Sequence, residues 1–223
     1  LKLKNLRKVN GKPLIYYPIK AALKSKVCDK VFVSTDSQEI ANVAKKLGAD
    51  VPFLRKKVFA GDLVTTEDTL KNALMEYEKF YKIKFDICVF LTATNIFRKI
   101  SWIKKSVEVL KKNNKYDSAF SVHQIYKHFW HYKNNKLEKV SKWMKNYTSR
   151  QIGSQLFRED TGLASATRSK FWRKGKRIGK KVYLIINHDS LTGIDIHNIH
   201  DLKIAEMAIR YIKKNKLNED MIT

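Results

Sequence analysis

The sequence has few cysteines, few acidic residues and no long hydrophobic run. Its two cysteines, Cys28 and Cys88, form neither a disulfide framework nor a metal-ligand spacing. Cys88 lies in an apolar run, so we expect a buried thiol. No apolar stretch of about 18 residues or more occurs, and no signal peptide is visible. These absences predict a soluble, cytoplasmic protein with no membrane partner.

The shortage of acidic residues leaves a large positive charge. The chain has 46 lysines and arginines against 21 aspartates and glutamates, a net charge of +25. A polyanion such as nucleic acid is one kind of partner that such a chain could bind. However, the lysines are spread over the whole length, and Lys, Ile and Asn are abundant together, as A/T-rich genes tend to encode. We therefore interpret the charge as coding bias and predict no nucleic-acid partner, although a positive field would help to attract anionic substrates.

What is present is an alternation of short apolar runs and amphipathic segments. The runs predict strands at residues 31–35, 51–54, 85–91, 119–122 and 181–186. The periodic segments predict helices that begin at Asp36 or Ser37, near Thr65, near Ile100 and at Asn198. This alternation predicts an α/β fold in a single domain, residues 1–223, with an open, mostly parallel sheet covered by helices on both faces. The strand at 85–91 is the most apolar and should lie at the centre of the sheet.

Residues 124–160 break this pattern. Aromatic and basic side chains mix there without a helix or strand period. Phe129, Trp130, Tyr132 and Trp143 make the segment too apolar for a free loop of its length. We therefore interpret it as an inserted arm that contacts a second copy of the chain, and we predict a homodimer.

Polar residues follow several of the predicted strands. Ser34–Asp36, Thr92–Thr94 and Asp195 all fall near inferred strand ends. Ligands of open α/β sheets bind at the carboxyl ends of the strands. These residues are therefore expected to line one crevice.

Three segments carry a resemblance to a known family. They are residues 1–15, in which Lys4-Asn5 is followed by Asn10-Gly11-Lys12-Pro13-Leu14; residues 31–36, Val-Phe-Val-Ser-Thr-Asp; and residues 193–197, Gly-Ile-Asp-Ile-His. In this order and spacing they resemble the CMP-sialic acid synthetases, the acylneuraminate cytidylyltransferases. The resemblance extends from Leu1 to about Ala208. In that family a strand and a glycine- and basic-rich phosphate loop come just before the position of Leu1, and residues 1–223 do not contain them.

The resemblance implies a Rossmann-like nucleotidyltransferase fold, with the middle segment as a dimerisation arm. It implies that the anomeric hydroxyl of an acidic nine-carbon sugar attacks the α-phosphorus of CTP, so that CMP is transferred and pyrophosphate is released. Such catalysis depends mainly on positioning and charge neutralisation. Two alternatives stay open: a synthetase for a Kdo-like, legionaminic or pseudaminic acid, and a basic binding protein, or degenerate homologue, without catalysis.

The resemblance also implies which residues bind the nucleotide. Lys4 and Asn5 stand where the first loop of the family ends in a nucleotide-binding Lys-Asn pair. Lysine supplies a point charge for phosphate, which makes Lys4 the expected catalytic cation, and asparagine can read a base or sugar edge. Arg55 resembles an arginine that helps to hold the cytidine nucleotide, and Thr66 aligns with a serine near it. A surface arginine after a strand, and a helix cap, are the alternative interpretations of Arg55 and Thr66.

Further segments resemble the sugar-binding part of the family. Leu91–Arg98 stands where the family usually has Leu-Gln-Pro-Thr-Ser-Pro-Leu-Arg, and the first, fourth and last residues match. Thr94 is the fourth of these, whereas Thr92 replaces a glutamine that contacts the sugar, which leaves the identity of the sugar open. Arg150 and Arg158 resemble residues that reach the sugar carboxylate, and an arginine fork suits a carboxylate.

The segment at 193–197 resembles a metal motif, Asp-Ile-Asp. Asp195 matches its first aspartate, and His197 stands in place of the second. Two carboxylates would hold Mg²⁺ between the triphosphate oxygens through hard oxygen ligands. Imidazole suits Mg²⁺ poorly, so the resemblance implies either Mg²⁺ held by Asp195, phosphates and waters, or a metal such as Mn²⁺. Asp195 is accordingly the second expected catalytic residue.

Overall fold

A computed structural model describes residues 3–61, 63–140, 155–217 and 219–222. Its central sheet contains β3 (Ile87–Phe90), β8 (Ser165–Arg168), β4 (Ser118–Ile125), β7 (Leu156–Glu159) and β9 (Val182–Asn187). β7 and β8 pair with successive parts of β4, and β9 pairs with β4 over residues 118–123, so β9 must occupy the other edge. The α/β architecture predicted from the sequence is confirmed.

The prediction of a mostly parallel sheet was wrong for the described strands. Only β4 and β9 are parallel; the β3–β8, β4–β8 and β4–β7 pairs are antiparallel. The reason is β8, which the sequence analysis missed because its residues Ser-Ala-Thr-Arg lack a hydrophobic alternation. β8 lies between β3 and β4 and runs against both, which leaves β3 at the end of the sheet and not at its centre.

Two further predicted strands, at residues 31–35 and 51–54, do not form. In their place the described chain has one parallel bridge. Phe32 pairs with Asp50, the Val33 amide donates to the Asp50 carbonyl at 3.0 Å, and the Asp50 amide donates to the Val31 carbonyl at 2.7 Å. The segment at 51–54 has no strand pairing in the described residues. The extended chain at Val31–Val33 therefore uses one of its two edges.

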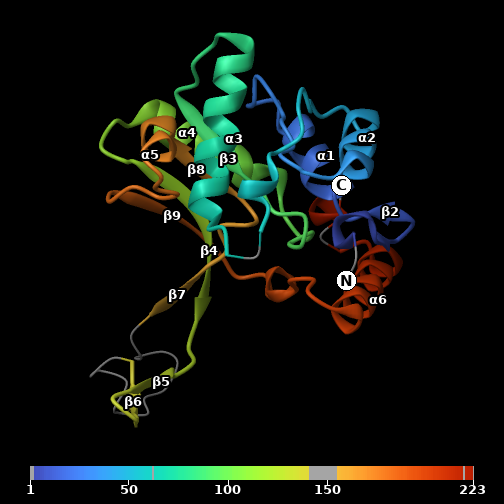
Figure 1. Cartoon of the computed structure of the whole chain (residues 1–223). Helices are drawn as coiled ribbons and strands as arrows, with labels where there is room; N and C mark the ends of the chain where they lie inside the picture. Colours follow the sequence, from blue (N-terminus) through green and yellow to red (C-terminus); the bar gives the residue numbers. More distant parts are fainter. Residues whose placement is uncertain (1–2, 62, 141–154, 218, 223) are drawn as a thin grey trace.

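Helices cover both faces of the sheet, as predicted (Figure 1). Val89 of β3 packs on one face with Val107 and Leu110 of α4 (Ile100–Lys112). The neighbouring Cys88 packs on the other face with α3 (Thr66–Tyr81) and α5 (Ser169–Arg173). The remaining α-helices are α1 (Tyr16–Ser25), which packs on α4, and α2 (Gln38–Lys46). Ser37 caps α2 by accepting a hydrogen bond from the Ile40 amide, which confirms the predicted helix start.

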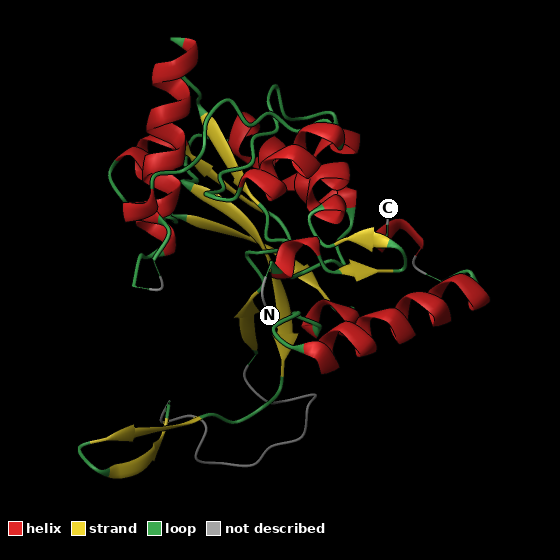
Figure 2. Cartoon of the chain, turned by 45° about the vertical axis from the view of Figure 1, so that its right-hand side comes forward, coloured by secondary structure: helices red, strands yellow, loops and turns green. Residues whose placement is uncertain are grey.

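The last long helix, α6 (Ile199–Asn215), lies beside the N-terminal hairpin of β1 (Lys8–Val9) and β2 (Lys12–Pro13), away from the central sheet (Figure 2). Asn198 caps it in a capping box with Asp201, as predicted. Short 3₁₀ helices complete the described elements: η1 (Lys4–Leu6), η2 (Lys57–Phe59), η4 (Ser190–Gly193) and η5 (Glu219–Met221). No helix within the described ranges has the length and apolar character needed to cross a membrane.

The predicted insertion leaves the domain as an arm (Figure 1). β4 and β7 form its base, and a hairpin of β5 (Trp130–Lys133) and β6 (Lys136–Lys139) lies at its end. Trp130 is 55% exposed and Tyr132 is 74% exposed. Trp143 lies outside the described residues. The exposed aromatic rings fit an arm that contacts a second subunit, and the homodimer stays a prediction.

A buried ion pair fixes α3 against α5. The Glu78 side chain is buried, and its carboxylate accepts hydrogen bonds from Arg173 Nη2 at 2.6 Å, from Arg173 Nε and the Phe85 amide at 3.0 Å, and from Lys84 Nζ at 3.1 Å. Burial alone would raise the pKa of this carboxyl, but the hydrogen bonds from Arg173, Phe85 and Lys84 outweigh it and lower the pKa to about 2.

This pair predicts an acid-sensitive contribution to stability. Because the folded pKa lies below the ordinary 4.5, the contribution is present above pH 4.5 and is lost as the pH falls towards 2. We expect Glu78→Gln to lower the free energy of unfolding at pH 7 by about 1–3 kcal/mol, since Arg173 loses a charged acceptor. The same variant should flatten the loss of stability between pH 5 and pH 2, by about the amount it costs at pH 7.

Urea unfolding at several pH values would measure both effects. Glu108→Gln, at an exposed position of α4, is the matched control and should change neither. An equal acid dependence in the wild type and Glu78→Gln would contradict the assignment.

Candidate functional site

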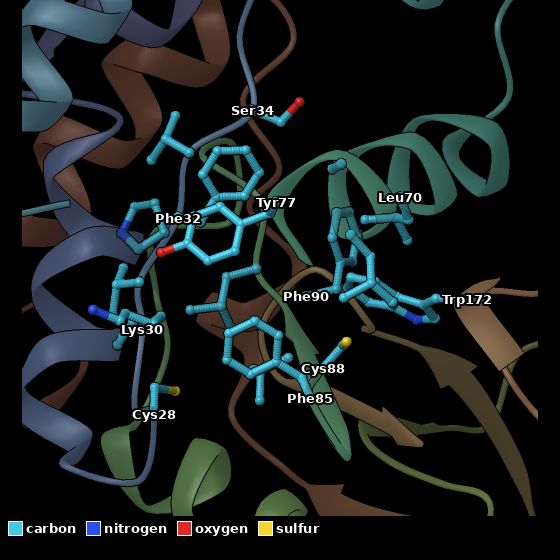
Figure 3. A pocket seen from close by; sticks show the side chains of 18 of the residues that line it. Cys28, Lys30, Phe32, Ser34, Leu70, Tyr77, Phe85, Cys88, Phe90 and Trp172 are labelled. Carbon is cyan, nitrogen blue, oxygen red and sulfur yellow. The ribbon is translucent and has the colours of Figure 1, made fainter. Parts of the chain in front are cut away.

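A cavity of about 540 Å³ lies between the Val31–Ser34 segment, α3 and β3 (Figure 3). Its walls are mainly apolar and include Leu70, Tyr77, Phe85, Phe90 and Trp172. Two residues predicted to bind the nucleotide, Asn5 and Arg55, also line it. An apolar wall cannot satisfy phosphate oxygens, so an anion suits only the parts of the cavity lined by polar or basic residues, such as Asn5, Arg55, Lys30 and Lys111.

The cavity is bordered by two backbone edges. On one side is the Val31–Val33 segment, whose bridge to Asp50 uses one edge only. On the other side is β3, which pairs only with β8 within the described part of the chain. Cys28 and Cys88 also line the cavity, and burial raises the pKa of the Cys88 thiol to about 12. The expectation that Cys88 is buried is confirmed.

Arg55 is held where the 31–35 segment ends. Its amide donates to the Thr35 carbonyl at 2.7 Å, and its Nη2 lies 3.4 Å from Asp36 Oδ1. The Arg55 Nε is buried and has no hydrogen-bond partner. The Arg55 guanidinium therefore has an N–H group that can donate a hydrogen bond to a ligand at the rim of the cavity.

The other three residues predicted to bind the nucleotide lie in two elements, η1 and α3. Lys4 and Asn5 form part of η1, and the Asn5 carbonyl accepts a hydrogen bond from the Ile15 amide at 3.0 Å. Thr66 is the first residue of α3 and is exposed. The cap of α3 is Thr65, whose hydroxyl accepts from the Asp68 amide at 3.1 Å, so Thr66 does not serve as the cap.

The Thr92–Asn95 turn, which carries the predicted sugar-binding residues Thr92 and Thr94, packs against Gly162. The Thr92 amide donates to the Gly162 carbonyl at 2.9 Å, and the Thr92 hydroxyl donates to Asn95 Oδ1 at 2.6 Å. A Cβ atom at Gly162 would lie 2.2 Å from Asn95 Oδ1, so only glycine fits. The turn and the loop after β7 are therefore locked together.

Arg98 holds this turn from beneath. Its side chain is fully buried, and its Nη2 donates to the carbonyls of Thr92, at 2.5 Å, and of Asn95. Burial lowers the pKa of this guanidinium to about 9. The sequence analysis matched Arg98 to the family pattern but gave it no role.

The residues predicted to bind the sugar carboxylate and the metal lie near the Thr92–Asn95 turn. Arg158, at the end of β7, forms a bidentate pair with Asp160 at 2.8 and 2.9 Å. Its Nη1 lies 3.5 Å from the position that a Cβ of Gly193 would take. The Ile196 amide donates to the Thr94 carbonyl at 3.2 Å, which places the residue after Asp195 beside the turn. Arg150 lies outside the described residues.

Asp195 and His197 form a pair that a cation could bind. Asp195 Oδ2 lies 3.1 Å from His197 Nε2, while Asp195 Oδ1 is buried without a hydrogen-bond partner. An unpaired buried carboxylate oxygen fits a metal ligand. No group of three or more His, Cys, Asp or Glu residues in the described ranges is arranged to hold a metal ion. A cation here would need further oxygens from phosphate and water.

The family match given below, together with the fold, defines the class of protein as a nucleotidyltransferase, an enzyme. The structure of CMP:2-keto-3-deoxy-manno-octonic acid synthetase complexed with CTP matches with a TM-score of 0.65, over 97% of this chain and 94% of that one. The two chains are 14% identical, so this likeness bears on the fold alone.

The family follows from the sequence. The model of the cytidylyltransferase family matches residues 1–215, and the chain belongs to this family. It is 29% identical to the post-translational flagellin modification protein B of Campylobacter coli over 213 residues, and 31% identical to the CMP-N,N'-diacetyllegionaminic acid synthase of Campylobacter jejuni over 222 residues. Each match covers 94% of this chain and 89% of the relative.

The Asp195–His197 pair generates a prediction about metal choice. Asp195→Asn should keep the fold and lower kcat by about 10²–10³-fold, since a cation could no longer offset the charge of the triphosphate. If His197 is a ligand, His197→Asp should shift the preference towards Mg²⁺, because it restores a second hard oxygen donor.

Activity with Mg²⁺ and with Mn²⁺ would be compared for the wild type and for His197→Asp. His200→Asp, an exposed histidine near the start of α6, is the matched control. An unchanged Mg²⁺/Mn²⁺ activity ratio in His197→Asp would remove His197 from the metal site.

Proposed function

We propose that this protein transfers CMP from CTP to an acidic nine-carbon sugar and releases pyrophosphate. The observation that carries the proposal is the juxtaposition of Arg158 with the loop that leads to Asp195. An arginine fork suits a sugar carboxylate, and a carboxylate with an unpaired oxygen suits the metal of a nucleotide. Membership of the cytidylyltransferase family supports the same reaction.

In the proposed reaction, the anomeric hydroxyl oxygen attacks the α-phosphorus of CTP. A bond forms between these two atoms, the bond from the α-phosphorus to the bridging oxygen breaks, and pyrophosphate leaves with the electron pair of that bond. The hydroxyl proton passes to solvent or to a base that we do not assign. The chain mainly orients both substrates and balances charge.

Each predicted residue has a place in this proposal. Lys4, Asn5, Arg55 and Thr66 would bind the nucleotide. Arg158 would bind the sugar carboxylate near Thr92 and Thr94, and Arg150 remains a second candidate for that carboxylate. Asp195 and His197 would hold Mg²⁺ or Mn²⁺, which neutralises negative charge on the phosphates when bound.

The class of sugar is supported more strongly than its identity. The relative from Campylobacter jejuni, 31% identical, is named for CMP-N,N'-diacetyllegionaminic acid. N-acylneuraminic, legionaminic and pseudaminic acids share a carboxylate and nine carbons. Thr92 replaces a glutamine of the resembling family and has a shorter side chain. Its hydroxyl contacts Asn95 and Gly162. We therefore propose a nine-carbon acid of this group.

The apolar cavity beside β3 also has a place in the proposal. Its two bordering backbone edges and its apolar walls suit an extended apolar segment that pairs on both sides. The family resemblance predicts a strand and a phosphate loop immediately before the position of Leu1. We propose that such a strand fills the cavity and that its loop reaches Asn5 and Arg55, which line the same cavity.

The thiol of Cys28 would report on this strand. In a protein limited to residues 1–223, a soluble thiol reagent should modify Cys28, which is partly exposed and lines the cavity. In a protein to which the family strand and phosphate loop have been added before Leu1 the reaction should be at least ~10-fold slower, because the thiol is covered. Cys28→Ser controls for reaction at Cys88. Equal rates for the two proteins would contradict the strand.

The activity itself is tested with a protein that carries the family strand and phosphate loop before Leu1. We expect it to form CMP-sugar and pyrophosphate from CTP and at least one of N-acetylneuraminic, legionaminic and pseudaminic acid. Lys4→Ala and Arg55→Ala should each weaken CTP binding by ~1.5–3 kcal/mol, since each removes a charge-assisted contact. Lys8→Ala, on the exposed hairpin, is the matched control.

Phosphorus NMR of the products and calorimetric titration with CTP would make these measurements. A protein that forms no CMP-sugar, shows no preference for CTP, and binds nucleic acid with a steep salt dependence would instead support the non-catalytic alternative.

A further inference from the structure

A hydrogen-bond network lies behind Arg158 and joins three separate elements. Its centre is Asn187, the last residue of β9, whose side chain is 3% exposed. Asn187 Nδ2 donates to the Val122 carbonyl at 3.0 Å and to Ser121 Oγ at 3.2 Å, and it lies 3.5 Å from Asp160 Oδ2. These contacts fix Asn187 to β4 and place its amide against the acid that pairs with Arg158.

The side-chain oxygen of Asn187 faces the loop that leads to Asp195. Asn187 Oδ1 lies 3.2 Å from the hydroxyl of Thr192 in η4 and 3.0 Å from Nδ1 of His123. The Thr192 side chain is 2% exposed, and its hydroxyl lies 2.7 Å from the Asp189 carbonyl. The single hydroxyl proton of Thr192 is shared between the Asp189 carbonyl, at the shorter distance, and Asn187 Oδ1, so Thr192 contacts Asn187 three residues before Asp195.

Among the described residues, the way Asp160 holds Arg158 leaves one end of the fork open. Asp160 accepts hydrogen bonds from Nε and Nη2 of Arg158, so Nη1 takes no part in the pair. That Nη1 borders Gly193, where a Cβ atom would lie in ordinary van der Waals contact with it, at 3.5 Å. A planar guanidinium fixed along one edge presents its remaining donors in a defined direction. Here the free end is directed along the segment that leads to Asp195.

We propose that Asp160 is a positioning residue for Arg158, and that Asn187, hydrogen-bonded to β4 and in contact with Asp160 and Thr192, keeps Arg158 and Asp195 at a fixed spacing. The identity of the bound group, a sugar carboxylate, rests on the proposed function. The roles of Asp160 and Asn187 in positioning Arg158 do not rest on the proposed function. If Asp160 instead competed with the sugar for Arg158, its removal would strengthen sugar binding.

Asp160→Asn distinguishes these effects. The KM for the sugar acid should rise by about 10–100-fold, the usual cost of losing a supporting contact, while the KM for CTP changes by less than about 2-fold. Asn187→Ala should raise the KM for the sugar and lower kcat as well, because it loosens both ends of the network. Glu206→Gln, which removes a carboxylate from exposed ion pairs on α6, is the control.

A double-mutant cycle guards against a fold defect. In an Arg158→Lys background, which lacks the fork, Asp160→Asn should add less than about 3-fold to the KM for the sugar. The effects would multiply if Asp160 acted only on stability. An unchanged or lower KM for the sugar in Asp160→Asn would overturn the proposal, as would full multiplication in the cycle.

A second readout is independent of catalysis. The Nε–H signal of Arg158 in ¹⁵N NMR should shift or vanish in Asp160→Asn and should also change in Asn187→Ala. If the wild type turned over no sugar acid but these signals changed, the proposed function would fail and the positioning network would stand. If the signals were unaffected in both variants, the network would be overturned whatever the activity.

Discussion

The turn at Thr92–Asn95 is the junction to which the parts of the candidate site attach, and the buried guanidinium of Arg98 holds that turn. Arg98 donates to two carbonyls of the turn from a fully buried position. A buried cation without an acidic partner is costly, so these carbonyl contacts must be kept whenever the chain is folded. The turn contacts Gly162, which follows the proposed sugar-binding residue Arg158 in the chain. It also contacts Ile196, which follows the proposed metal ligand Asp195.

This arrangement explains how residues far apart in sequence come to act together. Ala93 of the turn borders the apolar cavity that Asn5 and Arg55 also line. The loop after β7, which follows Arg158, and the loop after β9, which contains Asp195, contact the turn through Gly162 and Ile196. The nucleotide residues and the acid-binding residues thus flank one rigid turn. Rigid placement of this kind is what a reaction based on positioning requires.

Helices and caps could be predicted from the sequence because their causes are local. Ser37 and Asn198 carry side chains that satisfy free amides, and the apolar period of 100–110 marks α4. β8 could not be predicted, because small residues that pair on both edges leave no periodic signal. The resemblance located Arg158 and Asp195, but Asp160 and Asn187 become meaningful only once β4, β7 and β9 are side by side.

The central claim is that one site binds a sugar carboxylate at Arg158 and a nucleotide-bound cation at Asp195. A crystal structure of the protein with CTP, a nine-carbon sugar acid and Ca²⁺, an oxygen-seeking cation, would test this directly. The account predicts the carboxylate within hydrogen-bonding distance of Arg158 and the cation bound to Asp195, with the sugar hydroxyl facing the α-phosphorus. A sugar acid bound away from Arg158, or a cation that does not touch Asp195, would contradict it.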